Sequence, residues 1–250
     1  MSLQPNLRDL NQRSLPARNP LCVALDVDSR ERALYLVEEL YEIIGAVKLG
    51  PRLIHRYGES LVREIAAKIP VFIDCKFFDI PSTMVAAVRA SFDAGASFVT
   101  VHALAGCEAL EQLAKLEQLL NRERPFRILC VTILTSWGQE NLPSVIKAQS
   151  ISQSVFELAE LVKKSGLRSI VSSAEELPLV KSMDLFVVTP GIRFSDQEKD
   201  DQKRVMDPAQ AIQAGSSLLV VGRPILEAKN AKETALDFLT AIYANNLSLV

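Results

Sequence analysis

Eight short runs rich in β-branched residues alternate with longer amphipathic stretches along the 250-residue chain, and this alternation constrains the fold more than any other feature. The expected strands are Leu21–Asp26, Ala46–Leu49, Val71–Lys76, Ser97–His102, Arg127–Ile133, Ser169–Val171, Leu185–Val188 and Leu218–Val221. The expected helices are Arg30–Tyr41, Arg52–Lys68, Ser82–Ala94, Glu108–Asn121, Ser152–Ser165, Ala174–Lys181, Pro208–Ala214 and Ala231–Ala244. Parallel strands with helical crossovers produce this order, and eight such units predict a closed TIM-type (β/α)8 barrel, an α/β fold.

No Pro-, Gly- or Ser-rich linker and no low-complexity tract divides the chain into domains. We expect residues 1–20 to form a polar N-terminal arm and residues 21–250 to form a single barrel-shaped catalytic domain. The arm lacks the apolar stretch of a secretory signal, and no window reaches the roughly 18 consecutive apolar residues of a membrane span. The sequence therefore predicts a cytoplasmic protein with no membrane partner.

Charge and cysteine content narrow the classes of partner. The net charge of −2 does not favour nucleic acid or an acidic membrane, so any bound anion needs a local site. The cysteines form no C-x-x-C pair and no zinc-type spacing, which favours buried free thiols in a reducing cytosol and no metal. These cysteines are Cys22, Cys75, Cys107 and Cys130.

Polar residues gather where the expected strands end, which is the catalytic face of this kind of barrel. They are Asp26, Lys48, Asp74, Lys76, Asp79, His102, Thr135 and Ser136, followed by the segments "TPGIR" at 189–193 and "GRP" at 222–224. A histidine at the end of a strand is more often a hydrogen-bonded rim residue than a catalyst. The pattern predicts an active site at this one rim.

The stretch "FIDCKFFDIPST", residues 72–83, places three charges in or just after an apolar strand. Side chains two apart on a strand share a face, so Asp74 and Lys76 are expected to point together into the barrel. With Asp79 beyond the strand and Lys48 on the neighbouring one, two carboxylates and two ammonium groups form a neutral cluster that tolerates burial. A buried ion-pair network that only stabilises the barrel is the alternative interpretation.

The ends of the last two strands indicate a phosphate site. Gly222 permits close backbone approach, and Arg223 can donate two hydrogen bonds to phosphate oxygens. Pro190-Gly191 and Arg193 follow the neighbouring strand, and the loops after strands seven and eight often hold phosphate in this architecture. The alternative is a simple turn. The charged segment 194–207 follows the seventh strand and is expected to be a lid over this site.

The chain resembles the orotidine 5'-phosphate decarboxylase family. The motifs "ALDV", "VKLG", "FIDCKFFDIPST", "VHA", "VTILTS", "VVTPGIR", "DDQKRV" and "VVGRPI" match that family in order and spacing from Leu21 to the last helix. The resemblance implies decarboxylation of orotidine 5'-monophosphate to UMP and CO2 in de novo pyrimidine biosynthesis, without a cofactor or a metal. One departure is "VHALAG", where the family usually carries small residues at the position of Leu104.

The resemblance also implies roles for individual residues. Lys76 donates the proton to C6 of the pyrimidine, and Asp74 lies beside the substrate carboxylate. Asp79 and Thr83 reach across a homodimer interface into the partner's site, and Lys48 joins the catalytic charges to the ribose. The expected catalytic set is Lys76, Asp74, Asp79 and Lys48. The expected substrate-binding set is Asp26, Lys48, Ile80, Thr83, Thr135, Ser136, Pro190, Arg193, Gln202, Gly222 and Arg223.

Three other functions remain open at this level. A magnesium-dependent sugar-phosphate decarboxylase or synthase of the same barrel superfamily also carries D-x-K-x-x-D, but with an acid where this chain has Lys48, and a cation repels a metal there. A Schiff-base aldolase needs a lysine with a lowered pKa, whereas carboxylates raise it. A non-catalytic nucleotide-binding barrel would bind UMP without turnover.

Overall fold

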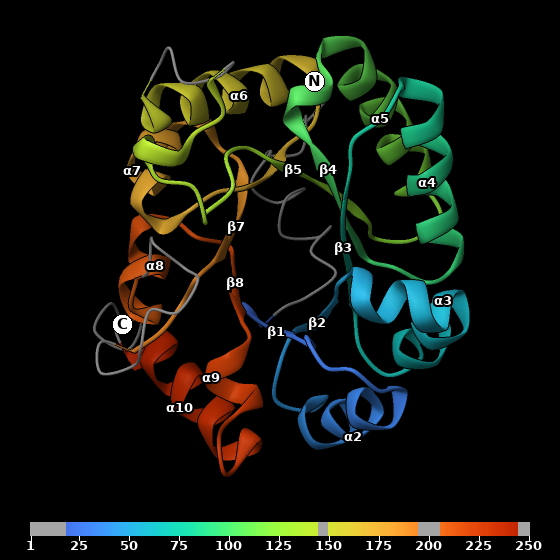
Figure 1. Ribbon diagram of the computed structural model, residues 1–250, viewed down its shortest axis with the longest axis vertical. Coiled ribbons are helices and arrows are strands. Elements are labelled where there is room, and N and C mark those ends of the chain that lie inside the picture. The colour runs from blue at the N-terminus through green and yellow to red at the C-terminus, as the bar shows by residue number, and fades with distance from the viewer. Residues whose placement is uncertain (1–18, 145–149, 195–205, 245–250) are drawn as a thin grey trace, which may run out of the picture.

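The computed structural model describes residues 19–144, 150–194 and 206–244, and its strands form the closed ring that the alternation predicts. The strands follow chain order around the barrel, each parallel to its neighbours, and β8 closes onto β1. Figure 1 shows this ring inside a layer of helices. The strands are β1 (Leu21–Ala24), β2 (Ala46–Leu49), β3 (Val71–Phe77), β4 (Phe98–His102), β5 (Arg127–Val131), β6 (Ser169–Val171), β7 (Phe186–Pro190) and β8 (Leu218–Val221).

The helices between the strands match the expected pattern, with differences at their ends. They are α2 (Arg30–Leu40), α3 (Pro51–Ala66), α4 (Pro81–Asp93), α5 (Cys107–Leu120), α6 (Ile151–Ser165), α7 (Leu177–Val180), α8 (Pro208–Ala214), α9 (Arg223–Leu226) and α10 (Ala231–Ala244). The expected helix at 174–181 is divided, because 3-10 turns at Ala174–Glu176 and Lys181–Met183 flank the short α7. Proline begins α3, α4 and α8, where its missing N–H costs nothing.

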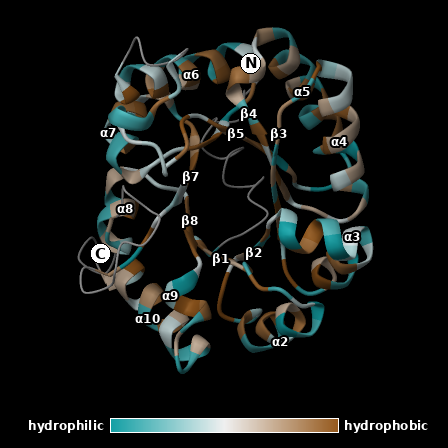
Figure 2. Ribbon diagram, viewed as in Figure 1, coloured by the Kyte–Doolittle hydropathy of each residue, from teal (hydrophilic) through white to brown (hydrophobic). Residues whose placement is uncertain are grey.

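Alternation along each strand separates two apolar layers. On β4, Phe98 points into the barrel, whereas Val99 and Val101 pack against the helices. Phe98 meets Phe72 edge-on at 6.1 Å and stacks with Phe186 at 6.3 Å between ring centroids. Figure 2 shows the matching apolar faces of the helices turned toward the strands. These rings fill the barrel near the strand starts.

The start of the described chain is bonded to the barrel floor. Asn19 Nδ2 donates to the Ile43 carbonyl at 2.6 Å, and the Leu219 N–H donates to the Pro20 carbonyl at 2.7 Å. A methyl group on Gly45 would lie 1.9 Å from the Asn19 carbonyl oxygen, so only glycine fits there. The last two residues of the expected arm, Asn19 and Pro20, therefore bond to the barrel, and its residues 1–18 lie outside the described residues.

The thiols are free, as expected, but they are not all buried. Cys22 and Cys130 are fully buried, Cys75 is half-buried, and Cys107 is exposed at the first residue of α5. The expectation of burial is wrong for Cys107 because the strand before it ends at His102 and a 3-10 turn carries the chain to the surface.

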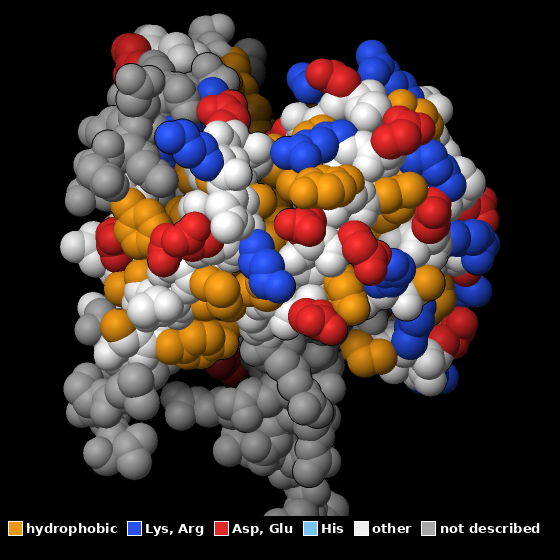
Figure 3. All heavy atoms as spheres, turned by 90° about the horizontal axis from the view of Figure 1, so that it is seen from below, with side chains coloured by type: hydrophobic (Ala, Val, Ile, Leu, Met, Phe, Trp, Pro, Cys, Tyr) orange, Lys and Arg blue, Asp and Glu red, His pale blue; other side chains and the backbone are white. Residues whose placement is uncertain are grey.

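The outer surface mixes charges of both signs. Figure 3 looks at the side of the molecule that carries α2 and α10, and acidic and basic side chains alternate there. Arg30 of α2 pairs with Glu64 of α3, and Lys68 pairs with Glu38. In the ranges 19–144, 150–194 and 206–244, no helix combines the length and the apolar composition that crossing a bilayer requires.

Candidate active site

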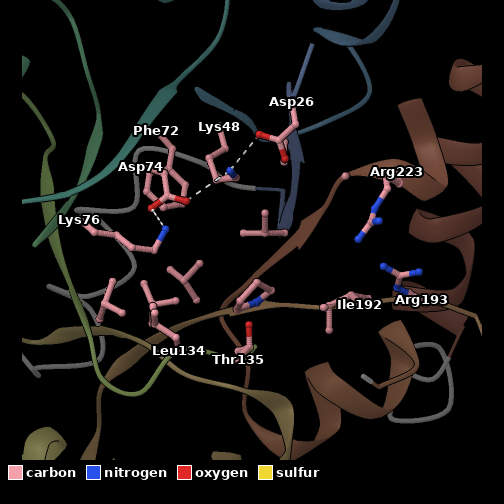
Figure 4. Close-up of a pocket in the computed structure, with 18 of the residues that line it drawn as sticks. Asp26, Lys48, Phe72, Asp74, Lys76, Leu134, Thr135, Ile192, Arg193 and Arg223 are labelled. Carbon is pink, nitrogen blue, oxygen red and sulfur yellow. Dashed lines mark hydrogen bonds and ion pairs between the residues drawn. The ribbon is translucent and has the colours of Figure 1, made fainter. Parts of the chain in front are cut away.

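A cavity of about 280 Å³ opens at the carboxyl ends of the strands. Its polar and charged side chains are those of Asp26, Lys48, Asp74, Lys76, Thr135, Arg193 and Arg223. Figure 4 shows the carboxylates and lysines on one side of the cavity and the two arginines on the other. The rim singled out in the sequence is therefore one concave site, of a size suited to a single small molecule.

Four charged side chains at this rim form one continuous set of contacts, which we call the rim cluster: Asp26, Lys48, Asp74 and Lys76. Lys48 Nζ lies 3.3 Å from Asp74 Oδ2 and 3.5 Å from Asp26 Oδ1. Lys76 Nζ lies 2.9 Å from Asp74 Oδ1. The rim cluster joins the ends of three neighbouring strands, and its charges cancel, which is the condition under which buried ions are tolerated.

Asp74 is the centre of the rim cluster and is only 13% exposed. Burial alone would raise the pKa of its carboxyl group, but the ammonium groups of Lys48 and Lys76 outweigh burial and hold the pKa below its ordinary value. Burial also opposes the charged form of Lys48, and the carboxylates of Asp74 and Asp26 reverse that effect, so the pKa of Lys48 is raised. Asp74 and Lys48 are therefore both ionised at neutral pH.

Asp74 and Lys76 reach the same cavity, as expected, but the strand between them is irregular. β3 and β4 align at Ile73–Val99 and at Phe77–Val101, so three residues of β3 lie opposite one residue of β4. Lys76 has a φ of 47°, in the left-handed region that residues other than glycine rarely occupy. Two-residue periodicity predicted the correct face, but the convergence depends on a bulge that periodicity does not contain.

The expectation that Asp79 joins Lys76 and Asp74 at one point is wrong within a single chain. Asp79, Ile80 and Thr83 are exposed and do not line the cavity. Asp79 Oδ1 instead accepts a hydrogen bond from the Ile80 N–H at 2.6 Å. The second carboxylate of the rim cluster is Asp26, because β1 ends at Ala24 and leaves Asp26 beside Lys48.

The expected phosphate residues lie together on the opposite side of the cavity. Pro190 ends β7, and Gly222 precedes α9 directly after β8. Arg193 is 7% exposed, and both Arg193 and Arg223 line the cavity (Figure 4). Two guanidinium groups facing one space favour an anion there.

The remaining expected residues divide into three cases. Thr135 lines the cavity, whereas Ser136 next to it is exposed and does not. Gln202, and with it most of the expected lid at 194–207, lies outside the described residues.

His102 is a rim residue held by its neighbours. Its Nδ1 accepts a hydrogen bond from the Leu104 N–H at 3.3 Å, and its ring lies 5.6 Å from that of Phe78. Burial and the nearby charge of Lys76 lower the pKa of the imidazole. His102 is therefore neutral at pH 7 and does not line the cavity, which supports a structural role.

Residues 19–238 match the family model for orotidine 5'-phosphate decarboxylase and HUMPS proteins. The chain belongs to this family. The resemblance read from the strand-end motifs is thus confirmed, and so is the expectation of an enzyme.

Similar proteins carry the same family name. Orotidine 5'-phosphate decarboxylase from Carboxydothermus hydrogenoformans is 40% identical over 225 residues, which cover 88% of this chain and 94% of the relative. The protein of that name from Syntrophomonas wolfei is 38% identical over 236 residues and covers 90% and 98%. The crystal structure of orotidine 5'-phosphate decarboxylase from Lactobacillus acidophilus superposes with a TM-score of 0.78 at 28% identity, covering 90% of this chain and 99% of that one. The likeness extends along nearly the whole of each chain.

Two features of this orotidine 5'-phosphate decarboxylase family site were not identified from the sequence. One is the apolar part of the cavity lining, made by Phe72, Val131, Ile133, Leu134, Val171, Val188, Ile192 and Val220. The other is Thr100 on β4, whose hydroxyl bonds to Asp74 at 2.9 Å. Alternation along β4 places Thr100 on the inner face between Phe98 and His102, and that signal was available in the sequence.

Proposed function

We propose that the protein decarboxylates orotidine 5'-monophosphate to UMP and CO2 without a metal or a cofactor. The observation that carries the proposal is the ammonium of Lys76, 2.9 Å from the sheltered carboxylate of Asp74, at one side of a cavity whose other side holds Arg193 and Arg223. A cation beside the reacting carbon and cations at the far end suit a substrate that develops negative charge at one end and carries phosphate at the other.

The proposed reaction needs an electrostatic catalyst because the substrate carboxylate is attached to a vinylic carbon. When the bond from C6 to the carboxyl carbon breaks, CO2 leaves and the electron pair stays on C6. The ammonium of Lys76 stabilises that pair and then transfers its proton to C6. Lys76 is left as a neutral amine that regains a proton from water, so the enzyme returns to its starting state.

Asp74 holds the Lys76 ammonium directed at the reacting carbon. Its two carboxylate oxygens contact different lysines, Oδ1 with Lys76 and Oδ2 with Lys48, so rotation of the carboxylate is restricted. A fixed charge of this kind needs no reorganisation when the carbanion forms. Lys48 and Asp26, which continue the rim cluster toward β1, are proposed to bind the ribose hydroxyls.

The phosphate is proposed to bind at the ends of β7 and β8. Arg193 and Arg223 supply charge, and Pro190 and Gly222 shape the backbone around them. A methyl group on Gly222 would meet Ala24 Cβ at 3.6 Å, an ordinary contact, so its space is available to a ligand. Binding energy from this remote group serves to hold the pyrimidine against the rim cluster. Thr135 and Ser136 are proposed to contact the pyrimidine, and Gln202 the phosphate.

A homodimer with shared sites is the proposed assembly. Phe78 and Ile80 follow β3 and are 61% and 64% exposed, beside the exposed Asp79 and Thr83. Large apolar side chains beside a catalytic rim favour a protein partner. In this arrangement Asp79 and Thr83 complete the partner's site rather than their own.

Complementation tests the shared site. Lys76→Ala and Asp79→Ala are each expected to be inactive alone, and their equimolar mixture to recover about a quarter of wild-type activity through mixed dimers with one intact site. Recovery indicates that Asp79 acts across the interface, whereas a mixture that stays inactive although the chains exchange contradicts the proposal.

The residue at the end of β2 separates this proposal from the magnesium-dependent alternative. Lys48 is a buried ammonium with a raised pKa, and it contacts the carboxylates that a metal would need as ligands. A magnesium ion bound to these carboxylates would lie next to the Lys48 ammonium, and two cations repel each other.

Reduction with borohydride in the presence of a carbonyl substrate tests the aldolase alternative, since only a Schiff base is trapped on Lys76.

The decisive experiment follows orotidylate absorbance with purified protein in EDTA. Wild type is expected to consume the substrate, Lys76→Ala to lose nearly all activity, and Lys115→Ala, at an exposed lysine of α5, to match wild type. Activity that disappears with the chelator, or a Lys76→Ala variant as fast as wild type, would refute the proposed mechanism. Tight UMP binding with no turnover would favour the non-catalytic barrel.

A further inference from the structure

Thr100 is a buried polar residue next to the reacting pair that is not among the cavity residues. It lies in the middle of β4, on the inner face between Phe98 and His102, and is 1% exposed. A buried hydroxyl is costly unless it is hydrogen-bonded, so its partners indicate what it does.

Besides a long contact of 3.5 Å to the Ile73 carbonyl, those partners are the two residues on which the proposed chemistry depends. Thr100 Oγ1 donates to Asp74 Oδ1 at 2.9 Å and accepts from the backbone N–H of Lys76 at 2.9 Å. The same carboxylate oxygen contacts Lys76 Nζ at 2.9 Å. One hydroxyl therefore contacts the carboxylate and the backbone that carries its ammonium partner.

The local backbone explains why this contact is needed. Thr100 is the residue of β4 between Val99 and Val101, opposite the three bulged residues of β3. At this bulge the side-chain oxygen of Thr100 accepts the Lys76 N–H. Lys76 itself holds a φ of 47°, a conformation that persists only where the surroundings stabilise it.

We propose that Thr100 is a positioning residue for decarboxylation: its hydroxyl holds the Lys76 backbone in the left-handed conformation that brings the ammonium onto Asp74. The proposal rests on the proposed function for its kinetic part, but its structural part does not require a substrate. Thr100 of β4 then acts on the reaction through Lys76 of β3.

Three substitutions separate the hydroxyl from the rest of the side chain. Thr100→Val keeps the shape and removes both hydrogen bonds, and Thr100→Ser keeps the hydroxyl and removes the methyl group. Thr132→Val is the matched control, because Thr132 is a fully buried threonine whose Oγ1 donates to the Val171 carbonyl at 3.0 Å and does not line the cavity.

The kinetic test compares kcat with UMP affinity. Thr100→Val is expected to lower kcat by about 10- to 100-fold, the effect of removing hydrogen bonds to a charged pair. Its affinity for UMP should change by less than about threefold, since phosphate and ribose contacts are untouched. Thr100→Ser is expected to recover most of kcat, and Thr132→Val to keep kcat while losing similar thermal stability.

The structural test is a crystal structure of Thr100→Val without substrate. Lys76 Nζ is expected to lie more than about 4 Å from Asp74, beyond an ion pair. An unchanged Lys76, or a kcat equal to that of Thr132→Val, would overturn the positioning role while leaving the proposed function intact. A wild-type enzyme that does not act on orotidylate would overturn the proposed function instead, and the crystal structure would still decide the role of Thr100.

Discussion

Two partly buried carboxylates in this protein have pKa values shifted in opposite directions. Asp74, at the rim, is ionised because Lys48 and Lys76 lower its pKa below the ordinary value despite burial. Glu117, on α5, is partly buried, and burial raises its pKa to about 7, although a hydrogen bond from the Ile128 N–H at 2.6 Å and the charges of Arg127 and Arg168 favour the ionised form. Burial raises the pKa in both places, but the neighbouring cations outweigh it only at Asp74.

The two carboxylates differ in what surrounds them. In the rim cluster each ion lies within 3.5 Å of an opposite charge, and the whole set faces a cavity. Glu117 accepts a backbone hydrogen bond between α5 and β5 and does not line the active-site cavity. A charge that must persist through a reaction is surrounded by counter-charges, whereas a structural carboxyl group can take up a proton near neutral pH.

Breaking the rim cluster should produce the largest effect. Asp74→Asn keeps the shape of the side chain but removes the carboxylate between Lys48 and Lys76, so Lys48 keeps only its contact with Asp26. We expect kcat for orotidylate to fall by about 10³-fold and the free energy of unfolding at pH 7 to fall by about 3 kcal/mol. Steady-state kinetics and urea unfolding measure both. An Asn variant with near-wild-type kcat would show that the ionised carboxylate is not needed.

The same substitution at Glu117 should act in the opposite direction. The folded pKa of about 7 lies above the ordinary 4.5, so stability is fully present below pH 4.5 and falls as pH rises through 7. Glu117→Gln keeps an oxygen for the Ile128 N–H and removes that loss. We expect equal stability at pH 4.5 and a variant more stable by up to about 3 kcal/mol at pH 8, with kcat unchanged.

Urea unfolding at pH values from about 4.5 to 8 measures the difference in unfolding free energy between wild type and Glu117→Gln. Glu157→Gln, at an exposed position on α6, is the control. The rim cluster should not contribute to the slope. The lowered pKa of Asp74 makes its stabilisation disappear only in acid, and the raised pKa of Lys48 makes its stabilisation disappear only in strong base. A parallel pH dependence of wild type and Glu117→Gln would contradict the assignment.

An arginine at the same rim, outside the rim cluster, should give an effect of intermediate size. Arg223→Ala is expected to weaken UMP binding by about 10- to 100-fold, the loss of charged hydrogen bonds to phosphate. Binding of uridine, which lacks the phosphate, should be nearly unchanged. Isothermal titration with both ligands measures the effect, and equal losses for UMP and uridine would place Arg223 outside a phosphate site.

His102 should give the smallest effect. Its pKa is lowered by burial and by Lys76, so it is neutral across the working range and has no proton to gain or lose there. His102→Gln keeps an acceptor for the Leu104 N–H, and we expect kcat/KM to change less than about fivefold, with the same pH profile. A wild-type inflection near pH 6.5 that the variant lacks would indicate acid–base work by His102.

Much of the active site was predictable because it follows strand ends. Asp26, Lys48, Asp74, Lys76, Arg193 and Arg223 are separated by up to 197 positions in the sequence, yet each stands at the end of an expected strand, and parallel strands of a barrel end at one rim. The resemblance to the family contributed the residue roles, which stay predictions, and the family match confirmed the resemblance.

The parts that were not predictable depend on contacts between strands. Asp79 was placed in the cluster because it lies three residues from Lys76, but the chain turns outward there and Asp26 takes the position beside Lys48. The protonation of Glu117 depends on the packing of α5 against β5, which a helical pattern does not specify.

The amino-acid sequence alone indicated an eight-stranded barrel with its charged residues at one mouth, because eight alternating units favour a closed ring over an open sheet and parallel strands of a ring end at one rim. Only the tertiary structure decided how Asp74 and Lys76 meet, through a bulge in β3 bonded to Thr100 of β4. Periodicity belongs to one segment, whereas register and closure depend on residues distant in the chain, and the bulge exists only once two strands are paired.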